Sequence, residues 1–189
     1  GFKLVQAYAQ KNRMPFEQIL PLLDLLVVSI ASDIVPLVGE NRILAYFGLK
    51  NLNREPSKGL LSIIKICGLD KHNITIDDIV FKIGPRINAA GMRMDENDEN
   101  ASPSGGHAAV ELLIEGNESI AEEFGSVIDA YNQDRKSIDR SVTQEAHDYI
   151  EGNPEMKALK STVIYNPRWM KGIVGIVASR LIETYYRPT

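Results

Sequence analysis

The sequence predicts an α/β protein that is mostly helical, and two observations carry this prediction. Apolar residues recur at helical spacing over long stretches, chiefly residues 16–30 and 120–150. Near the end, the β-rich residues 162–165 precede the turn Asn166-Pro167 and a further helical pattern over residues 172–186. A strand, a loop and a helix in this order open an α/β unit, so the last part of the chain predicts an α/β domain.

The apolar spacing predicts the helices in chain order. They lie at residues 1–12, 15–30, 40–52, 60–66, 108–114, 119–150 and 172–186. Pro15 suits the first turn of the second helix, and Thr75, with Asp78 three residues later, resembles a capped helix start. Gly84-Pro85 predicts a break in the chain, and the acidic, apolar-poor residues 94–106 predict a loop.

Length and composition bound the class of protein. A chain of 189 residues with 44% hydrophobic residues can form one ordinary domain or parts of two. Its longest apolar run, residues 25–31, is interrupted by Ser29 and is far shorter than the roughly 20 residues that span a bilayer, so no membrane partner is expected. The single cysteine, Cys67, cannot form an internal disulfide, which favours a reducing, cytoplasmic setting. Because the chain begins at Gly1 without a methionine, we expect an excerpt of a longer protein.

Charge is unevenly distributed along the chain. The formal net charge of −4 excludes a globally basic nucleic-acid footprint. Residues 90–125 carry nine acids and one base, whereas residues 160–189 carry five bases and one acid. The five bases are Lys160, Arg168, Lys171, Arg180 and Arg187. A polyanion would prefer this second region, although a solvated face at each place is the simpler interpretation.

Asp33 is the first candidate for chemistry, because it follows the mostly apolar residues 25–31. A carboxylate in apolar surroundings needs a cation, a metal or several N–H donors to stay charged. The alternative is an aspartate that ends a helix before Pro36. The three histidines, His72, His107 and His147, lack the spacing of metal ligands.

A second candidate segment follows Gly84-Pro85. Arg86, Asn88 and Arg93 are polar side chains among residues that are otherwise apolar or small. The planar guanidinium of arginine suits phosphate oxygens, which favours a phosphate contact here. The alternative is a turn whose arginines pair with nearby acids such as Asp95.

A third candidate lies between the predicted strand and the last helix. Arg168, Trp169 and Lys171 occupy the loop, and the helix begins near Gly172. A helix N-terminus attracts anions, and an exposed tryptophan beside cations suits a stacked base and a phosphate. The alternative places Trp169 in the core and leaves the cations solvated.

Five segments together resemble the RecJ branch of the DHH phosphoesterase superfamily. They are Gly1-Phe-Lys-Leu-Val-Gln-Ala, Ser29-Ile-Ala-Ser-Asp-Ile-Val-Pro-Leu37, Gly84-Pro-Arg-Ile-Asn-Ala-Ala-Gly91, Asn132-Gln-Asp-Arg-Lys136 and Trp169-Met-Lys-Gly-Ile-Val-Gly-Ile-Val-Ala-Ser-Arg180, with Tyr186-Arg-Pro188 after the last. They stand in the family's order and cover nearly the whole chain, so the ordered set is specific although no single segment is.

The resemblance implies a two-domain enzyme with a central groove. Residues 1–107 would be the C-terminal part of the DHH catalytic domain, residues 108–153 the connector helix region, and residues 154–189 the start of the DHH-associated α/β domain. The implied activity is the 5′→3′ removal of nucleotides from single-stranded DNA in recombination and repair, with other repair or recombination proteins as further partners. Two divalent ions, Mn²⁺ or Mg²⁺, would activate water and stabilise the leaving oxygen. The oligomeric state is left open.

Several of the candidate residues gain a role from this resemblance. Asp33 matches a metal-ligand aspartate of the family. Arg86, Asn88 and Arg93 fall in a segment linked to phosphate binding. The opening of the associated domain is matched by Trp169, Lys171 and Gly172.

The chain also departs from the family pattern. It reads Gly91-Met-Arg-Met94, one residue longer than usual, and has Met170 where the family often has histidine. The Asp-His-His motif is absent from these 189 residues. One aspartate cannot hold two ions, so we expect the chain by itself to be inactive.

Two other functions remain open on the sequence. One is a phosphodiesterase of the same superfamily for short oligonucleotides or cyclic dinucleotides. The other is a scaffold that binds single strands without cutting them.

Overall fold

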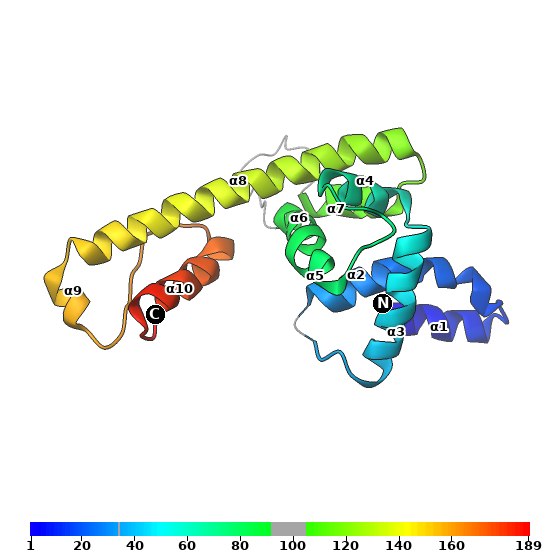
Figure 1. Cartoon of the computed structure of the whole chain (residues 1–189), viewed down its shortest axis with the longest axis horizontal. Coiled ribbons are helices and arrows are strands. Elements are labelled where there is room, and N and C mark those ends of the chain that lie inside the picture. The colour runs from blue at the N-terminus through cyan, green and yellow to red at the C-terminus, as the bar shows by residue number, and fades with distance from the viewer. Residues whose placement is uncertain (34, 92–104) are drawn as a thin grey trace. The chain divides into compact units, whose positions relative to one another are not determined.

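The structure is a computed structural model, and it describes residues 1–33, 35–91 and 105–189 (Figure 1). Within these ranges the chain is mostly helical, as predicted, and no strand occurs. The helices are α1 (Phe2–Lys11), η1 (Phe16–Gln18), η2 (Leu20–Leu22), α2 (Leu23–Ser32), α3 (Gly39–Arg54), α4 (Lys58–Ile66), α5 (Ile76–Asp78), η3 (Ile79–Ile83), α6 (Gly84–Gly91), α7 (Gly105–Ile114), α8 (Glu118–Glu151), α9 (Pro154–Ala158) and α10 (Lys171–Tyr185).

The predicted strand at residues 162–165 is wrong. Val163 and Tyr165 are more than four-fifths exposed, and Thr162 N donates to Pro188 O at 2.8 Å. A β-rich sequence forms a strand only beside a second strand that completes its ladder, and the described part of the chain offers none.

The predicted break at Gly84-Pro85 is also wrong, because the chain stays helical through it. The turn before it, η3, is a π-helix, and α6 begins directly at Gly84. Pro85 has no N–H to donate and its ring crowds the carbonyl four residues earlier, so a regular α-helical turn cannot continue there. A widened π turn accommodates the proline without ending the helix.

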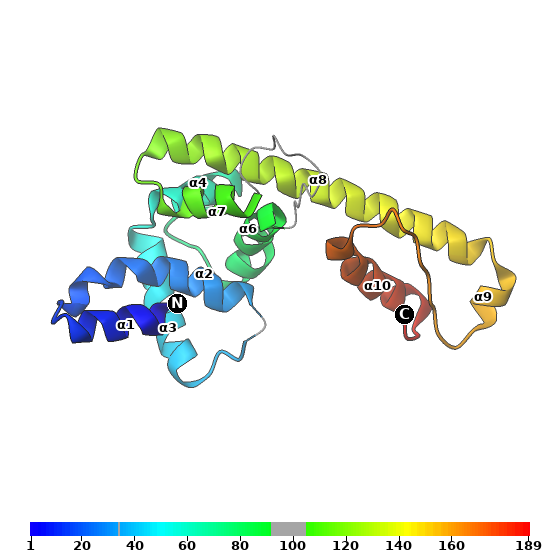
Figure 2. The same ribbon diagram turned by 180° about the vertical axis from the view of Figure 1, so that it is seen from behind.

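The chain divides into two compact units, Gly1–Tyr131 and Asn132–Thr189. In the first unit α2 packs against α3 and α6, and α4 packs against α7 (Figures 1 and 2). Its core is made of fully buried aliphatic side chains. They include Val27, Leu52, Leu60, Ile63, Ile79, Ile83, Leu112 and Ile128. Because these residues come from six different elements, the first unit has one continuous core.

A buried aspartate ties two helices of this unit together. Asp24, at the start of α2, is only 2% exposed. Its carboxylate accepts hydrogen bonds from Leu25 N at 2.6 Å and from Ser57 N at 2.7 Å. These two donors offset the cost of burying the charge and fix the start of α4 beside the start of α2.

The second unit packs α10 against the C-terminal part of α8. Val142, Ala146 and Ile150 of α8 form its core. The partners from α10 are Ile173, Val177 and Leu181. These positions recur at helical spacing on both helices, which is why the sequence periodicity predicted both of them. No helix in the described ranges is long and apolar enough to cross a membrane.

Gly59 permits a close approach of α4 to α7 in the first unit. A Cβ added there would stand 2.0 Å from the backbone oxygen of Leu112, and Leu112 is fully buried in α7. A backbone atom cannot rotate away as a side chain can, so any larger residue would push α4 and α7 apart.

We therefore expect Gly59→Ala to destabilise the first unit by about 2 kcal/mol or more. The control is Gly106→Ala in α7, where a Cβ meets no described atom within 4 Å. It should be neutral or stabilising by up to about 1 kcal/mol. Urea unfolding followed by circular dichroism measures both. Equal stability of the two variants would contradict this close packing of α4 on α7.

Candidate functional site

Asp33 caps the C-terminus of α2 and is exposed. Its N–H donates to Ser29 O at 3.3 Å, and its own backbone oxygen accepts from Val35 N at 2.9 Å. The premise that aliphatic side chains enclose this carboxylate is therefore wrong, because the apolar run before it turns into the core while Asp33 emerges at the helix end.

The described residues do not build a metal site by themselves. No three His, Cys, Asp or Glu side chains gather in a group that could hold an ion within residues 1–33, 35–91 and 105–189. Asp33 supplies one carboxylate, whereas Mg²⁺ and Mn²⁺ need several oxygen or nitrogen ligands.

Arg86, in the first turn of α6, lies in an ion pair. Its Nε donates to Asp129 Oδ1 of α8 at 2.8 Å, and its Nη1 donates to Lys82 O at 2.9 Å. Its side chain is 14% exposed. Pairing of an arginine with an acid was the alternative left open by the sequence, but the acid is Asp129 and not a neighbour in the chain. Asn88 is exposed on the same helix, and Arg93 lies outside the described residues.

The turn that leads to Arg86 is held by a capping box. Thr75 Oγ1 accepts from Asp78 N at 3.2 Å, and Asp78 Oδ2 accepts from Thr75 N at 3.0 Å. Lys82 Nζ donates to Asp78 Oδ1 at 2.7 Å. The hydrogen bond from Lys82, followed by those from Thr75, lowers the pKa of Asp78 to about 2. The capping box confirms the helix start predicted from the sequence.

Trp169 is half-buried and packs against the core of the second unit. Its Nε1 donates to Glu145 Oε2 at 3.0 Å. This is the packed arrangement that the sequence left open beside base stacking. Arg168 and Lys171 are exposed on either side of Trp169, and within the described ranges neither cation takes part in an ion pair.

Two other bases of the C-terminal region serve the fold. Arg180 Nη2 donates to Asp139 Oδ2 at 2.6 Å, and the Asp139 side chain is 4% exposed. Arg187 donates to Thr162 Oγ1 at 2.7 Å and to two backbone oxygens. The basic region therefore keeps fewer cations for a ligand than its composition indicates.

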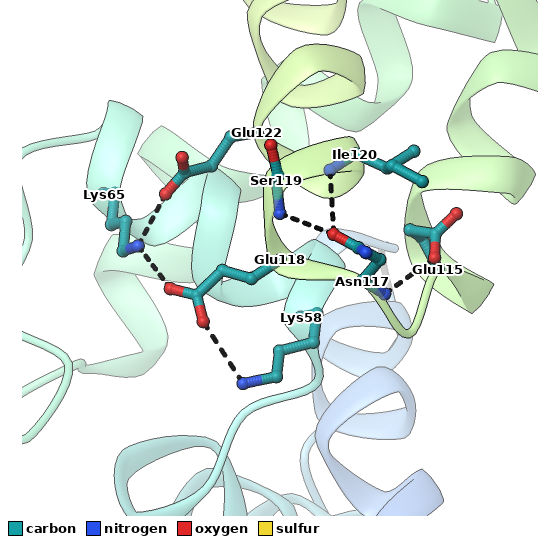
Figure 3. A network of polar contacts seen from close by, with 8 residues as sticks. All are labelled: Lys58, Lys65, Glu115, Asn117, Glu118, Ser119, Ile120 and Glu122. Atoms are coloured by element: carbon teal, nitrogen blue, oxygen red, sulfur yellow. Dashed lines mark hydrogen bonds and ion pairs between the residues drawn. The ribbon is translucent and has the colours of Figure 1, made fainter.

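The acidic region of the first unit is likewise partly neutralised, as Figure 3 shows. Lys65 Nζ of α4 lies 2.7 Å from both Glu118 Oε1 and Glu122 Oε1 of α8, and Lys58 Nζ lies 3.3 Å from Glu118 Oε2. The hydrogen bond to Glu118 raises the pKa of Lys65, and the same bond lowers the pKa of Glu118. These carboxylates join α4 to α8 and show no metal-binding arrangement.

No family model matches the chain, but individual proteins do. The chain is 36% identical over 190 residues to the single-stranded-DNA-specific exonuclease RecJ of Bacillus subtilis, in an alignment that covers 100% of this chain and 22% of that protein. The Escherichia coli protein of the same name is 30% identical over 189 residues, covering 97% of this chain and 30% of its own. The chain is RecJ-like.

The solved structures agree with this assignment at the level of the fold. RecJ of Thermus thermophilus in complex with Mg²⁺ superposes with a TM-score of 0.76 and 24% identity, covering 95% of this chain and 26% of that one. An exonuclease RecJ bound to manganese gives a TM-score of 0.74. The RecJ-like chain spans between a fifth and a third of the length of the Bacillus subtilis and Escherichia coli relatives. These relatives favour neither the oligonucleotide phosphodiesterase nor the scaffold.

Sequence reasoning missed the acids that hold the candidate residues in place. Asp129 and Glu145 both lie on α8, far in sequence from the Arg86 and Trp169 side chains that they bind. Each occupies a polar position of an amphipathic helix, where an acid usually means a solvated face. The RecJ-like segments contain Arg86 and Trp169 but not their partners Asp129 and Glu145.

The low pKa of Asp78 makes the stability of the first unit depend on pH in the acidic range. A carboxylate whose pKa falls from 3.8 to about 2 on folding stabilises the fold above about pH 4, and this contribution is lost as the pH falls toward 2. Asp78→Asn should lower the melting temperature at pH 7 and flatten the decline of stability between pH 4 and 2. The control is Asp77→Asn, which removes the same charge from an exposed side chain. Calorimetric melting across this range measures both; identical acid profiles would contradict the prediction.

Proposed function

We propose that this chain is part of an exonuclease that removes nucleotides from single-stranded DNA in the 5′→3′ direction with Mn²⁺ or Mg²⁺. One observation carries the proposal: the whole chain aligns at 36% identity with a protein named as a single-stranded-DNA-specific exonuclease. Recombination and repair, a cytoplasmic location and other repair proteins as partners belong to the same proposal. So does the division into a catalytic part, residues 1–107, a connector region, residues 108–153, and an associated domain, residues 154–189.

Asp33 is the residue that we assign to the metal. It is exposed at the end of a helix most of whose residues are buried. The packing of this helix therefore fixes the backbone position of Asp33. Hard divalent cations prefer carboxylate oxygens. Solved RecJ structures contain Mg²⁺ or Mn²⁺, which supports the choice of ion. Because the described residues offer no complete site, the further ligands have to come from outside them.

Arg168 and Lys171 are the cations that we assign to the DNA backbone. Both are exposed, and Lys171 stands in the first turn of α10. A cation at a helix N-terminus faces the positive end of the helix dipole, so Lys171 does not serve the stability of α10. An anion bound there would be attracted by the helix end and by Lys171 together. Trp169 holds this loop through its packing and its bond to Glu145.

Replacement of Asp33 tests the catalytic part of the proposal. In a chain of the relatives' full length that contains these residues, Asp33→Ala should lower Mn²⁺-dependent cleavage of single strands by at least about 100-fold and weaken Mn²⁺ binding measured by calorimetry. Asp77→Ala, which removes another exposed acid of the same unit, should leave both unchanged. Full cleavage and Mn²⁺ binding by the Asp33 variant would refute the assignment.

Salt dependence tests the DNA contacts. Each backbone contact on a single strand contributes about 0.7 to the slope of log affinity against log salt concentration. The double variant Arg168→Gln, Lys171→Gln should lose about 1.4 of that slope, and its affinity at low salt should fall. The control pair Lys11→Gln, Lys71→Gln removes two exposed cations from the first unit and should not change the slope. Fluorescence anisotropy with a labelled oligothymidine measures it, and an unaltered slope in the first pair would contradict the assignment.

A further inference from the structure

The Arg86–Asp129 ion pair joins α6 to α8 inside the first unit. The Arg86 side chain is 14% exposed and that of Asp129 is 26% exposed, so both charges are largely withdrawn from water. The guanidinium uses two of its donors on two different acceptors, Asp129 Oδ1 and Lys82 O. A pair with this burial and this geometry fixes its partners more firmly than an exposed pair does.

Arg86 also binds the backbone of the turn that precedes it. That turn, η3, is a π-helix, in which Gly84 N donates to Ile79 O, five residues back, so it is wider than a regular α-helical turn. Arg86 Nη1 reaches back to one of its carbonyls, that of Lys82, at 2.9 Å. The same side chain therefore stabilises the π turn on one side and holds α8 on the other.

This anchored turn lies against the end of α2. A Cβ added to Gly84 would stand 2.5 Å from Ser32 Oγ, so the first residue of α6 touches the last residue of α2. Asp33 follows Ser32 directly. A contact path thus runs from Asp129 of α8 through Arg86 and Gly84 to the residue beside Asp33.

A direct phosphate contact by Arg86 would be costly in this arrangement. The guanidinium would have to leave Asp129, whose carboxylate would then stay three-quarters covered without its cation. It would also release the Lys82 carbonyl. Arg168 and Lys171 face no such cost, because they are exposed and outside the ion pairs of the described chain.

We infer that Arg86 is a positioning residue: through its pair with Asp129 it holds the start of α6 against the end of α2 and so sets the placement of Asp33. The inference rests on the proposed function, since it assigns Asp33 to the metal. It predicts that Asp129, which no phosphate would approach, matters as much for cleavage as Arg86 does.

A double-mutant cycle tests the inference in a full-length chain that contains these residues. Arg86→Gln and Asp129→Asn should each lower kcat by about tenfold with KM for a single strand unchanged, and the double variant should be no slower than either single variant. Both should weaken Mn²⁺ binding in calorimetry to the same extent. Arg86→Lys keeps the charge and should recover part of the activity. The slope of DNA affinity against salt should stay that of the unaltered protein.

Three other outcomes can be told apart from the expected one. If Arg86→Gln loses about 0.7 of the salt slope and raises KM while Asp129→Asn changes neither, Arg86 contacts phosphate and the inference is wrong. Unchanged Mn²⁺ affinity and unchanged kcat in both single variants also overturn it. If the unaltered protein does not cut single strands, the proposed function fails. The Mn²⁺ affinities of Arg86→Gln and Asp129→Asn then still test the inference: equal weakening supports it, and unequal weakening overturns it.

Discussion

The burial of α2 is the constraint on which the first unit depends. This helix is apolar on nearly every side, and Leu23, Val27 and Ile30 are almost completely buried. Such a helix is stable only when other elements cover it, and α3 and α6 do so. The packing of the helix body has a consequence at its end. Asp33 is exposed directly after the end of α2, so the packing of the helix decides where its carboxylate emerges.

Polar contacts of this unit also hold the elements around α2 in place. Asp24 fixes the start of α4 beside the start of α2, and Arg86 fixes α6 to α8. Neither contact adds much hydrophobic burial. Each one instead removes a degree of freedom from the elements around α2, because a buried charge tolerates few alternative geometries. The apolar core supplies the stability, and these pairs select one arrangement of it.

The sequence predicted the elements whose signal is local. The apolar stripes of α8 and α10 repeat at the helical period, and Thr75 with Asp78 forms a cap within one turn, so both could be found without knowing the fold. The prediction of a strand at residues 162–165 was wrong because a local pattern does not show whether a second strand is there to pair with it. The partner of Arg86 was hidden for a similar reason: Asp129 is 43 positions away, on a polar face that has no periodic signature.

The same distinction separates the cations of the second unit. Counted along the chain, Arg168, Arg180 and Arg187 are equivalent positive charges. In the structure Arg180 pairs with the buried Asp139, and Arg187 binds Thr162 and the backbone before it. Arg168 and Lys171 remain exposed where α10 begins, and there the helix dipole adds to their field. These two exposed cations therefore stand together at the start of one helix, although the basic residues of the sequence are spread over the last thirty positions.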